Sequence, residues 1–221
     1  MNVDPSLLPA FVVWLSWPFY IAALVPALRA APWPVLKANR LESLFIGGIA
    51  CVAISWSMNA GIHPGLELHL LGATALTLIF GLSFAIVAAS AALAAVSSIG
   101  VYDWQAFAMN GLLLAVLPAL ITHWIGLQAY KRLPHNFFVY IFVVAFLGAM
   151  LAVGVVILVS GVLLLALDAY PAAIVLYDYL AIMPLIMFPE GFLTGMIITI
   201  LVVLRPQWVR TFDDRDYIHG K

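Results

Sequence analysis

Two imidazoles and a carboxylate lie within seven residues of one another in the stretch IHPGLELHLLG. They belong to His63, Glu67 and His69. Imidazole nitrogen is a good ligand for divalent cobalt, nickel, copper and zinc, and a carboxylate can complete the ligand shell. A separation of six residues does not place the two histidines on one helical face, so they can converge only through the turn that Pro64-Gly65 predicts. The stretch therefore indicates a candidate metal site, although His63 also fits a histidine in a solvated loop.

A further carboxylate stands in a strongly apolar run. Glu190 occurs in the segment MFPEGFLTG, between two prolines and two glycines. Ionisable groups inside a membrane are costly and commonly functional. We therefore count Glu190 with His63, Glu67 and His69 as a candidate metal ligand. The alternative is a carboxylate that hydrogen-bonds a neighbouring helix and fixes the bundle.

Two other polar residues in apolar runs are better explained by structure. Asn110, in FAMNGLL, has an amide that can hydrogen-bond across helices or ligate through its carbonyl oxygen, and packing is the favoured reading. Asp178 lies between Tyr177 and Tyr179, which predicts an interfacial position in an aromatic belt. The chain contains no nucleophile elbow, phosphate-binding loop or HExxH motif, so we do not expect an enzyme or an ATPase.

The composition indicates an integral membrane protein. Of 221 residues, 66% are hydrophobic and 9% are charged, which leaves too little polar surface for a soluble domain. The length fits one domain, residues 1–221, built as an all-α bundle of about seven transmembrane helices. The apolar runs are Leu7–Leu28, Leu44–Ile62, Leu68–Gly100, Trp104–Tyr130, Phe137–Leu167 and Ala172–Leu204.

The basic residues predict the orientation of these helices. All nine lysines and arginines follow the first run, the fourth run or the last run, so the positive-inside rule makes these segments cytoplasmic and the N-terminus external. The third run, Leu68–Gly100, must then leave from the outer face and return to it. We expect a hairpin or re-entrant pair of short helices, broken near Gly81. Glu190 lies 15 residues before Arg205, roughly 22 Å from the cytoplasmic edge, which is the outer half that His69 also occupies.

Three segments, in this order and spacing, resemble the CbiM/NikM family of substrate-specific membrane components of energy-coupling factor transporters. They are GLELHLLGATALTLIFG, DWQAFAMNGLL and PEGFLTGMIITILVVLRP. His69 to Gly72 match the family's histidine followed by Leu-(Leu/Ile)-Gly, Asn110 matches its asparagine in the next spanning helix, and Glu190 with Gly191 matches its Glu-Gly. The resemblance implies seven membrane helices with an external N-terminus, and Co²⁺ or Ni²⁺ as the transported substrate.

The N-terminus departs from the family pattern. By the resemblance, the metal is held by the N-terminal amine, a histidine at position 2 and the histidine of the HLLG stretch. Here position 2 is Asn2, so His69 carries over and the second imidazole does not.

We therefore expect a metal-uptake permease of the bacterial plasma (inner) membrane, multi-pass and without a permanently bound cofactor. Its partners, by resemblance, are a transmembrane coupling subunit and cytoplasmic ATPase subunits. One alternative is a membrane scaffold or assembly protein of the same fold that has lost metal transport. Another is a small ion carrier or proton-coupled carrier that uses Glu190 and His69 as a relay.

Overall fold

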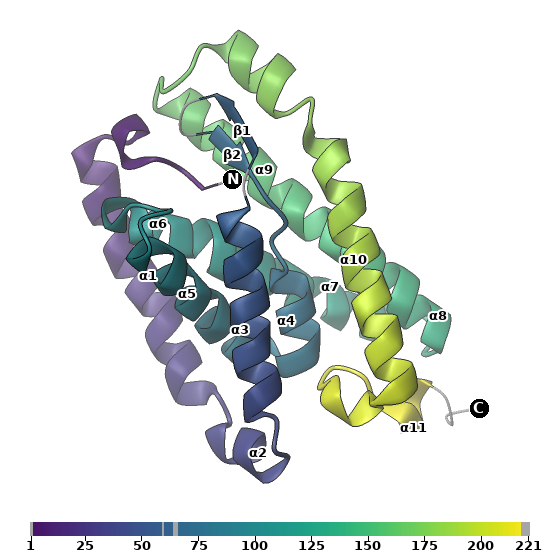
Figure 1. Ribbon diagram of the computed structural model, residues 1–221. Coiled ribbons are helices and arrows are strands. Elements are labelled where there is room, and N and C mark those ends of the chain that lie inside the picture. The colour runs from purple at the N-terminus through teal and green to yellow at the C-terminus, as the bar shows by residue number, and fades with distance from the viewer. Residues whose placement is uncertain (1, 59, 64–65, 218–221) are drawn as a thin grey trace.

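The computed structural model describes residues 2–58, 60–63 and 66–217 (Figure 1). The described helices are α1 (Ala10–Ala30), α2 (Trp33–Ala38), α3 (Glu42–Ser57), α4 (Ala73–Phe80), α5 (Leu82–Ser98), α6 (Phe107–Asn110), α7 (Leu117–Arg132), α8 (Phe137–Val139), α9 (Gly148–Ala166), α10 (Met183–Leu204) and α11 (Asp214–Tyr217). Two strands, β1 (Ala60–His63) and β2 (Leu66–Leu68), form an antiparallel pair. Short 3₁₀ turns cover Pro5–Leu7, Trp104–Ala106 and Pro206–Trp208.

Four helical segments are long and apolar enough to cross a membrane: Ala10–Ala30, Trp104–Arg132, Phe137–Ala166 and Ile174–Leu204. The last three contain π-helical stretches at Gly111–Val116, Tyr140–Leu147 and Ile174–Tyr179. Helices α3 and α5 are shorter, with 16 and 17 residues. The expected all-α membrane bundle is confirmed at this level. The expected seven crossings are reached only if α4 is counted, and its eight residues are too short for a core about 30 Å thick.

The third apolar run, Leu68–Gly100, is broken into two helices at Gly81. Helix α4 ends at Phe80, α5 begins at Leu82, and Gly81 between them has φ 84° and ψ 167°. Backbone with a positive φ strains residues that carry a Cβ, so glycine is the residue suited to this position. The predicted break near Gly81 is confirmed. Helix α5 then packs its small residues at the centre of the bundle, where Ala85, Ala88, Ala89 and Ala92 have no exposed surface.

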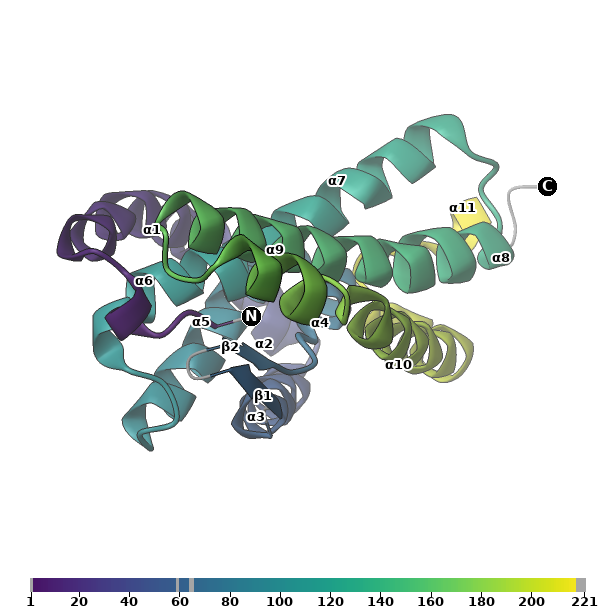
Figure 2. The ribbon, with the colours of Figure 1, turned by 90° about the horizontal axis from the view of Figure 1, so that it is seen from above.

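The start of the same run is a strand rather than a helix. Residues Leu66–Leu68 alternate buried, half-buried and buried, which is the period of a strand with one covered face. The N-terminal segment joins this pair of strands, because Val3 forms an antiparallel bridge with Leu66. Seen from above, the N-terminal segment lies beside β1 and β2 (Figure 2). The turn predicted at Pro64-Gly65 lies outside the described residues.

The two prolines of the last run occupy different positions in the helix. Pro184 lies in the first turn of α10, where a missing N–H leaves no hydrogen bond unmade. The helical path is interrupted before it, in the turn that joins the π-helical stretch Ile174–Tyr179 to α10. Pro189 does lie inside α10, one residue before Glu190.

The C-terminal segment packs against the end of α4. The backbone N–H of Arg210 donates to the carbonyl of Ile79 (2.9 Å), and both the N–H and the hydroxyl of Thr211 donate to the carbonyl of Leu78 (3.3 and 2.8 Å). The Thr211 hydroxyl also lies 2.6 Å from that of Tyr140. These bonds satisfy carbonyls that the break at Gly81 removes from the helical ladder.

The basic segments share one end of the bundle. Tyr130, near the end of α7, donates to Asp216 of the C-terminal segment (3.1 Å). The end of α2 shares a pocket with the same segment, lined in part by Asn39 and Arg210. The strand pair and the N-terminal segment lie at the opposite end (Figure 1).

Candidate metal centre

His69 is buried in an aromatic surrounding at the end of β2. His69 is 3% exposed. Its ring centroid lies 5.7 Å from that of Trp56 and 6.1 Å from that of Tyr102. The Nδ1 atom lies 3.2 Å from the carbonyl oxygen of Leu70. Donation to that carbonyl makes Nδ1 the protonated nitrogen and leaves the Nε2 lone pair available. Nε2 is buried and has no hydrogen-bond partner among the described residues, which is uncommon for a buried polar atom.

The N-terminal segment is held beside this histidine by Asn110. The Asn110 carbonyl oxygen accepts from the Val3 N–H (2.8 Å), and its amide donates to the Val3 carbonyl (3.2 Å). The two hydrogen bonds engage both backbone polar groups of Val3, which lies 107 positions from Asn110 in the sequence. Asn110 therefore hydrogen-bonds the N-terminal segment rather than a neighbouring helix, and it positions Asn2, the residue next to Val3.

Asn2 contributes a second buried polar atom without a partner. Its side-chain amide donates to a carboxylate oxygen of Glu67 (3.2 Å), and this contact directs its Oδ1 atom elsewhere. Oδ1 has no hydrogen-bond partner among the residues that the structure describes. Because Val3 pairs with Leu66 in antiparallel register, Asn2 stands opposite Glu67, and His69 follows two positions later. Sequence reasoning treated Asn2 only as a missing histidine and missed this placement.

Glu190 holds the loop that follows His69. Its two carboxylate oxygens accept from the backbone N–H groups of Leu71 (2.7 Å) and Gly72 (2.8 Å), and the residue is 3% exposed. Gly72 has φ 65°, and a Cβ there would stand 3.0 Å from the Val52 side chain, so both its backbone and its space favour glycine. Glu190 is close to His69, as its depth predicted, and its oxygens are already engaged.

Helix α3 holds the other side of this loop. The Ser55 hydroxyl donates to the carbonyl of Leu70 (3.1 Å), and the Trp56 indole N–H donates to the carbonyl of Leu71 (3.1 Å). Tyr102 in turn donates to the Trp56 carbonyl (3.1 Å). The loop backbone that follows His69 is therefore fixed from α3 and α10 together.

His63 is committed to a different partner. Its Nε2 lies 2.8 Å from Oδ2 of Asp178, and the two side chains are 31% and 46% exposed. Asp178 therefore joins the π-helical stretch Ile174–Tyr179 to the strand pair. The predicted aromatic belt around it is only half right, because Tyr177 is 77% exposed while Tyr179 is completely buried.

The four predicted ligands do not form one cluster. Within residues 2–58, 60–63 and 66–217, no three His, Cys, Asp or Glu side chains gather into a group that could hold a metal ion. The structure brings Glu67 to Asn2, Glu190 to the loop after His69, and His63 to Asp178. An ion at His69 would therefore also need amide, backbone or water oxygen as ligands.

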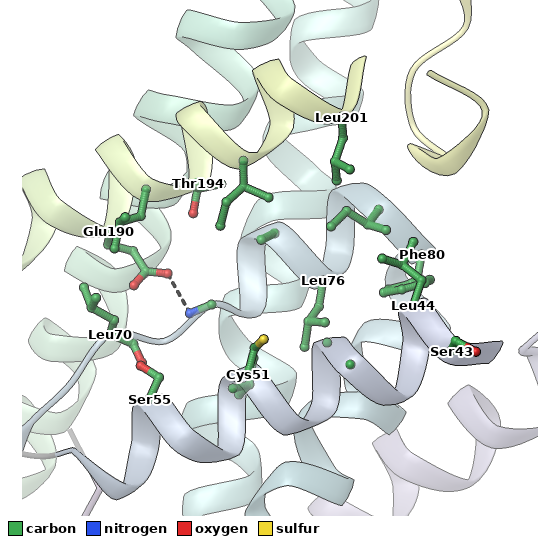
Figure 3. A pocket seen from close by; sticks show the side chains of 18 residues that line it. Ser43, Leu44, Cys51, Ser55, Leu70, Leu76, Phe80, Glu190, Thr194 and Leu201 are labelled. Carbon is green, nitrogen blue, oxygen red and sulfur yellow. Dashed lines mark hydrogen bonds between the residues drawn. The ribbon is translucent and has the colours of Figure 1, made fainter. Parts of the chain in front are cut away.

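A pocket of about 480 Å³ lies below the loop, between α3, α4 and α10. Figure 3 shows Glu190 at one end of it, hydrogen-bonded to the loop backbone, and Phe80 and Leu44 toward the other. Most of the lining is apolar, with Ser55, Thr194 and Glu190 among the few polar side chains. Such a surface cannot replace the hydration shell of a cation, so the pocket supplies no ligands beyond the loop.

Comparison with known proteins identifies the family. A family model described as cobalt uptake substrate-specific transmembrane region, CbiM, matches residues 2–208. The chain belongs to the CbiM family. Family members are membrane components of transporters rather than enzymes, so this chain is a multi-pass substrate-specific component of a cobalt or transition-metal uptake system.

Two solved structures share the CbiM-family fold seen here. A truncated transition metal transporter matches with a TM-score of 0.73 and 18% identity, over 92% of this chain and 99% of that one. A second transition metal transporter matches with the same TM-score and 19% identity, over 92% and 93% of the two chains. A comparison with curated proteins gave no significant match.

Proposed function

We propose that this CbiM-family chain binds Co²⁺ or Ni²⁺ as its transported substrate at Nε2 of His69 and Oδ1 of Asn2. The observation that carries the proposal is that both atoms are buried and unpartnered among the described residues. They belong to two segments that pair in register. Buried polar atoms without partners are rare in proteins, and a bound ion is one of the groups that can satisfy them.

Asn2 changes the chemistry that the family resemblance implies. An amide oxygen is a harder and weaker ligand than imidazole for late first-row ions. The amide contact to Glu67 (3.2 Å) sets the direction of this oxygen, as outer-shell carboxylates do for metal ligands. We infer that this chain binds its ion less tightly than a position-2 histidine would allow, and that backbone and water oxygens complete the shell.

We further propose that the strand pair faces outward and that the basic end faces the cytoplasm of a bacterial cell. The nine basic residues support this orientation. The chain carries no phosphate-binding loop of its own, so uptake by it requires a coupling subunit and ATPase subunits at the basic end.

The expected orientation can be measured with reporter fusions. Fusions after Lys37 and Arg132 should report the cytoplasm, and a fusion at Asp103 should report the outside, because basic segments are retained on the cytoplasmic side. The two basic positions serve as mutual controls. A cytoplasmic signal at Asp103 would overturn the outward placement of the α4–α5 hairpin.

The function is tested by calorimetric titration of the untagged, purified protein with Co²⁺ and Ni²⁺. The wild-type protein should bind, and Asn2→His should bind about 10- to 100-fold more tightly, the range over which changes around a metal alter affinity. Asn39→His is the matched control, because it places the same side chain at the exposed C-terminal end of α2.

Absence of binding by both the wild-type protein and Asn2→His would contradict the proposal. The scaffold alternative would then take its place. A proton relay through Glu190 is disfavoured by a separate observation, because both oxygens of Glu190 accept backbone hydrogen bonds.

A further inference from the structure

A second pair of ligand-type side chains lies away from His69. His63, at the end of β1, places Nε2 2.8 Å from Oδ2 of Asp178. Asp178 belongs to the π-helical stretch Ile174–Tyr179, 115 positions further along the chain. The His63 ring is also held by the ring of Tyr170, at a centroid distance of 6.0 Å.

The pair differs from His69 in its exposure. The His63 and Asp178 side chains are 31% and 46% exposed, whereas His69 is 3% exposed. An ion pair this open to water contributes little to stability, so stability alone does not account for it. Water and dissolved ions can therefore reach this pair directly, whereas the His69 side chain is closed off from them.

The geometry of the pair suits a divalent ion. Imidazole nitrogen and carboxylate oxygen bind transition metals at about 2.1 Å, so two such ligands at right angles stand about 3.0 Å apart. The observed separation of 2.8 Å needs an opening of only a few tenths of an ångström. A neutral imidazole and a carboxylate are also the mixed ligand set that cobalt and nickel accept.

We propose that His63 and Asp178 form a capture site for a divalent transition-metal ion, distinct from His69, with water completing the shell. This inference rests on the proposed function, since it assigns the first step of substrate binding. Two protein ligands hold an ion weakly, which lets it move on. The strand pair connects the two sites directly, because β1 carries His63 and β2 leads into His69.

Conservative substitutions can distinguish a metal-binding role of His63 and Asp178 from a purely structural hydrogen bond between them. In His63→Gln the side-chain amide can still donate to Asp178, and in Asp178→Asn the amide oxygen can still accept from His63. Each change replaces an imidazole nitrogen or a carboxylate oxygen by an amide, which binds late first-row ions more weakly. Equilibrium dialysis with radioactive Co²⁺ on untagged full-length protein should show a tight and a weak class of site in the wild type. Both variants should weaken the weak class by at least tenfold and leave the tight class unchanged. His123→Gln, on exposed α7 surface, is the control.

The outcomes distinguish this inference from the proposed function. A weak class unchanged in His63→Gln would overturn the capture site, while loss of the tight class in His69→Ala would still support the function. Loss of both classes together in His63→Gln would place His63 in one site with His69 and would also overturn a separate capture site. If no class depends on His69 either, the proposed function fails.

Discussion

The His69→Ala protein is expected to lose high-affinity Co²⁺ and Ni²⁺ binding altogether. In the proposed site His69 supplies the one imidazole, and the position-2 imidazole implied by the family resemblance is replaced by Asn2. An amide oxygen with backbone and water ligands is a poor site for late first-row ions. We therefore expect affinity to fall by more than about 100-fold, beyond the 10- to 100-fold typical of outer-shell changes.

Calorimetry and cobalt uptake in cells that carry the partner subunits would measure this loss. His123→Ala removes an exposed imidazole from α7 and should bind normally. Trimming His69 also leaves space between Trp56 and Tyr102, so the thermal unfolding of the variant should be recorded beside its binding. A His69→Ala protein that folds and still binds Co²⁺ as the wild type does would exclude this histidine as the ligand.

Replacing Glu190 is expected to destabilise the loop after His69 and to weaken metal binding through it. The carboxylate accepts two backbone hydrogen bonds, a buried one from Leu71 and a partly buried one from Gly72. Glu190→Gln can accept only one of them, because its amide nitrogen is a donor facing a second donor. A buried donor without a partner costs about 1–3 kcal/mol, so Glu190→Ala, which leaves two, should lose about twice as much.

Thermal unfolding in detergent should rank the wild type first, Glu190→Gln second and Glu190→Ala last, with Co²⁺ affinity falling in the same order. Glu42→Gln, in the first turn of α3, makes the same substitution away from the loop and should be neutral. If Glu190→Gln instead kept full stability while losing metal binding, the carboxylate would have to act on the ion itself rather than on the loop.

The course of the helices was predictable where charge and glycine dictated it. Nine basic residues in three groups required the run Leu68–Gly100 to turn back, and Gly81 is a residue at which it could do so. The strand at Leu66–Leu68 was also readable, since two leucines flank Glu67 with period two. It was missed because Leu68 was counted with the apolar run that follows it.

The partners of the polar residues were not predictable in the same way. Asn110 meets Val3 across 107 positions, and His63 meets Asp178 across 115. Such pairings depend on how segments distant in the sequence pack in the folded protein, and the local periodicity of the sequence does not specify that packing. The sequence predicted that His69 and Glu190 lie close together, and the hydrogen bonds of Glu190 to the loop after His69 agree with that. Their division of labour, one as candidate ligand and one as loop anchor, came only from the hydrogen bonds.

The contact between α4 and the C-terminal segment has a consequence for how the protein is made. The carbonyls of Leu78 and Ile79 depend on Arg210 and Thr211, and the Thr211 hydroxyl reaches a residue 133 positions earlier. During synthesis these carbonyls lack this donor until the segment after α10 has been made. Unpaired backbone groups are poorly tolerated in lipid. We therefore expect α4 to reach its final position only after α10 and the segment that follows it have been inserted.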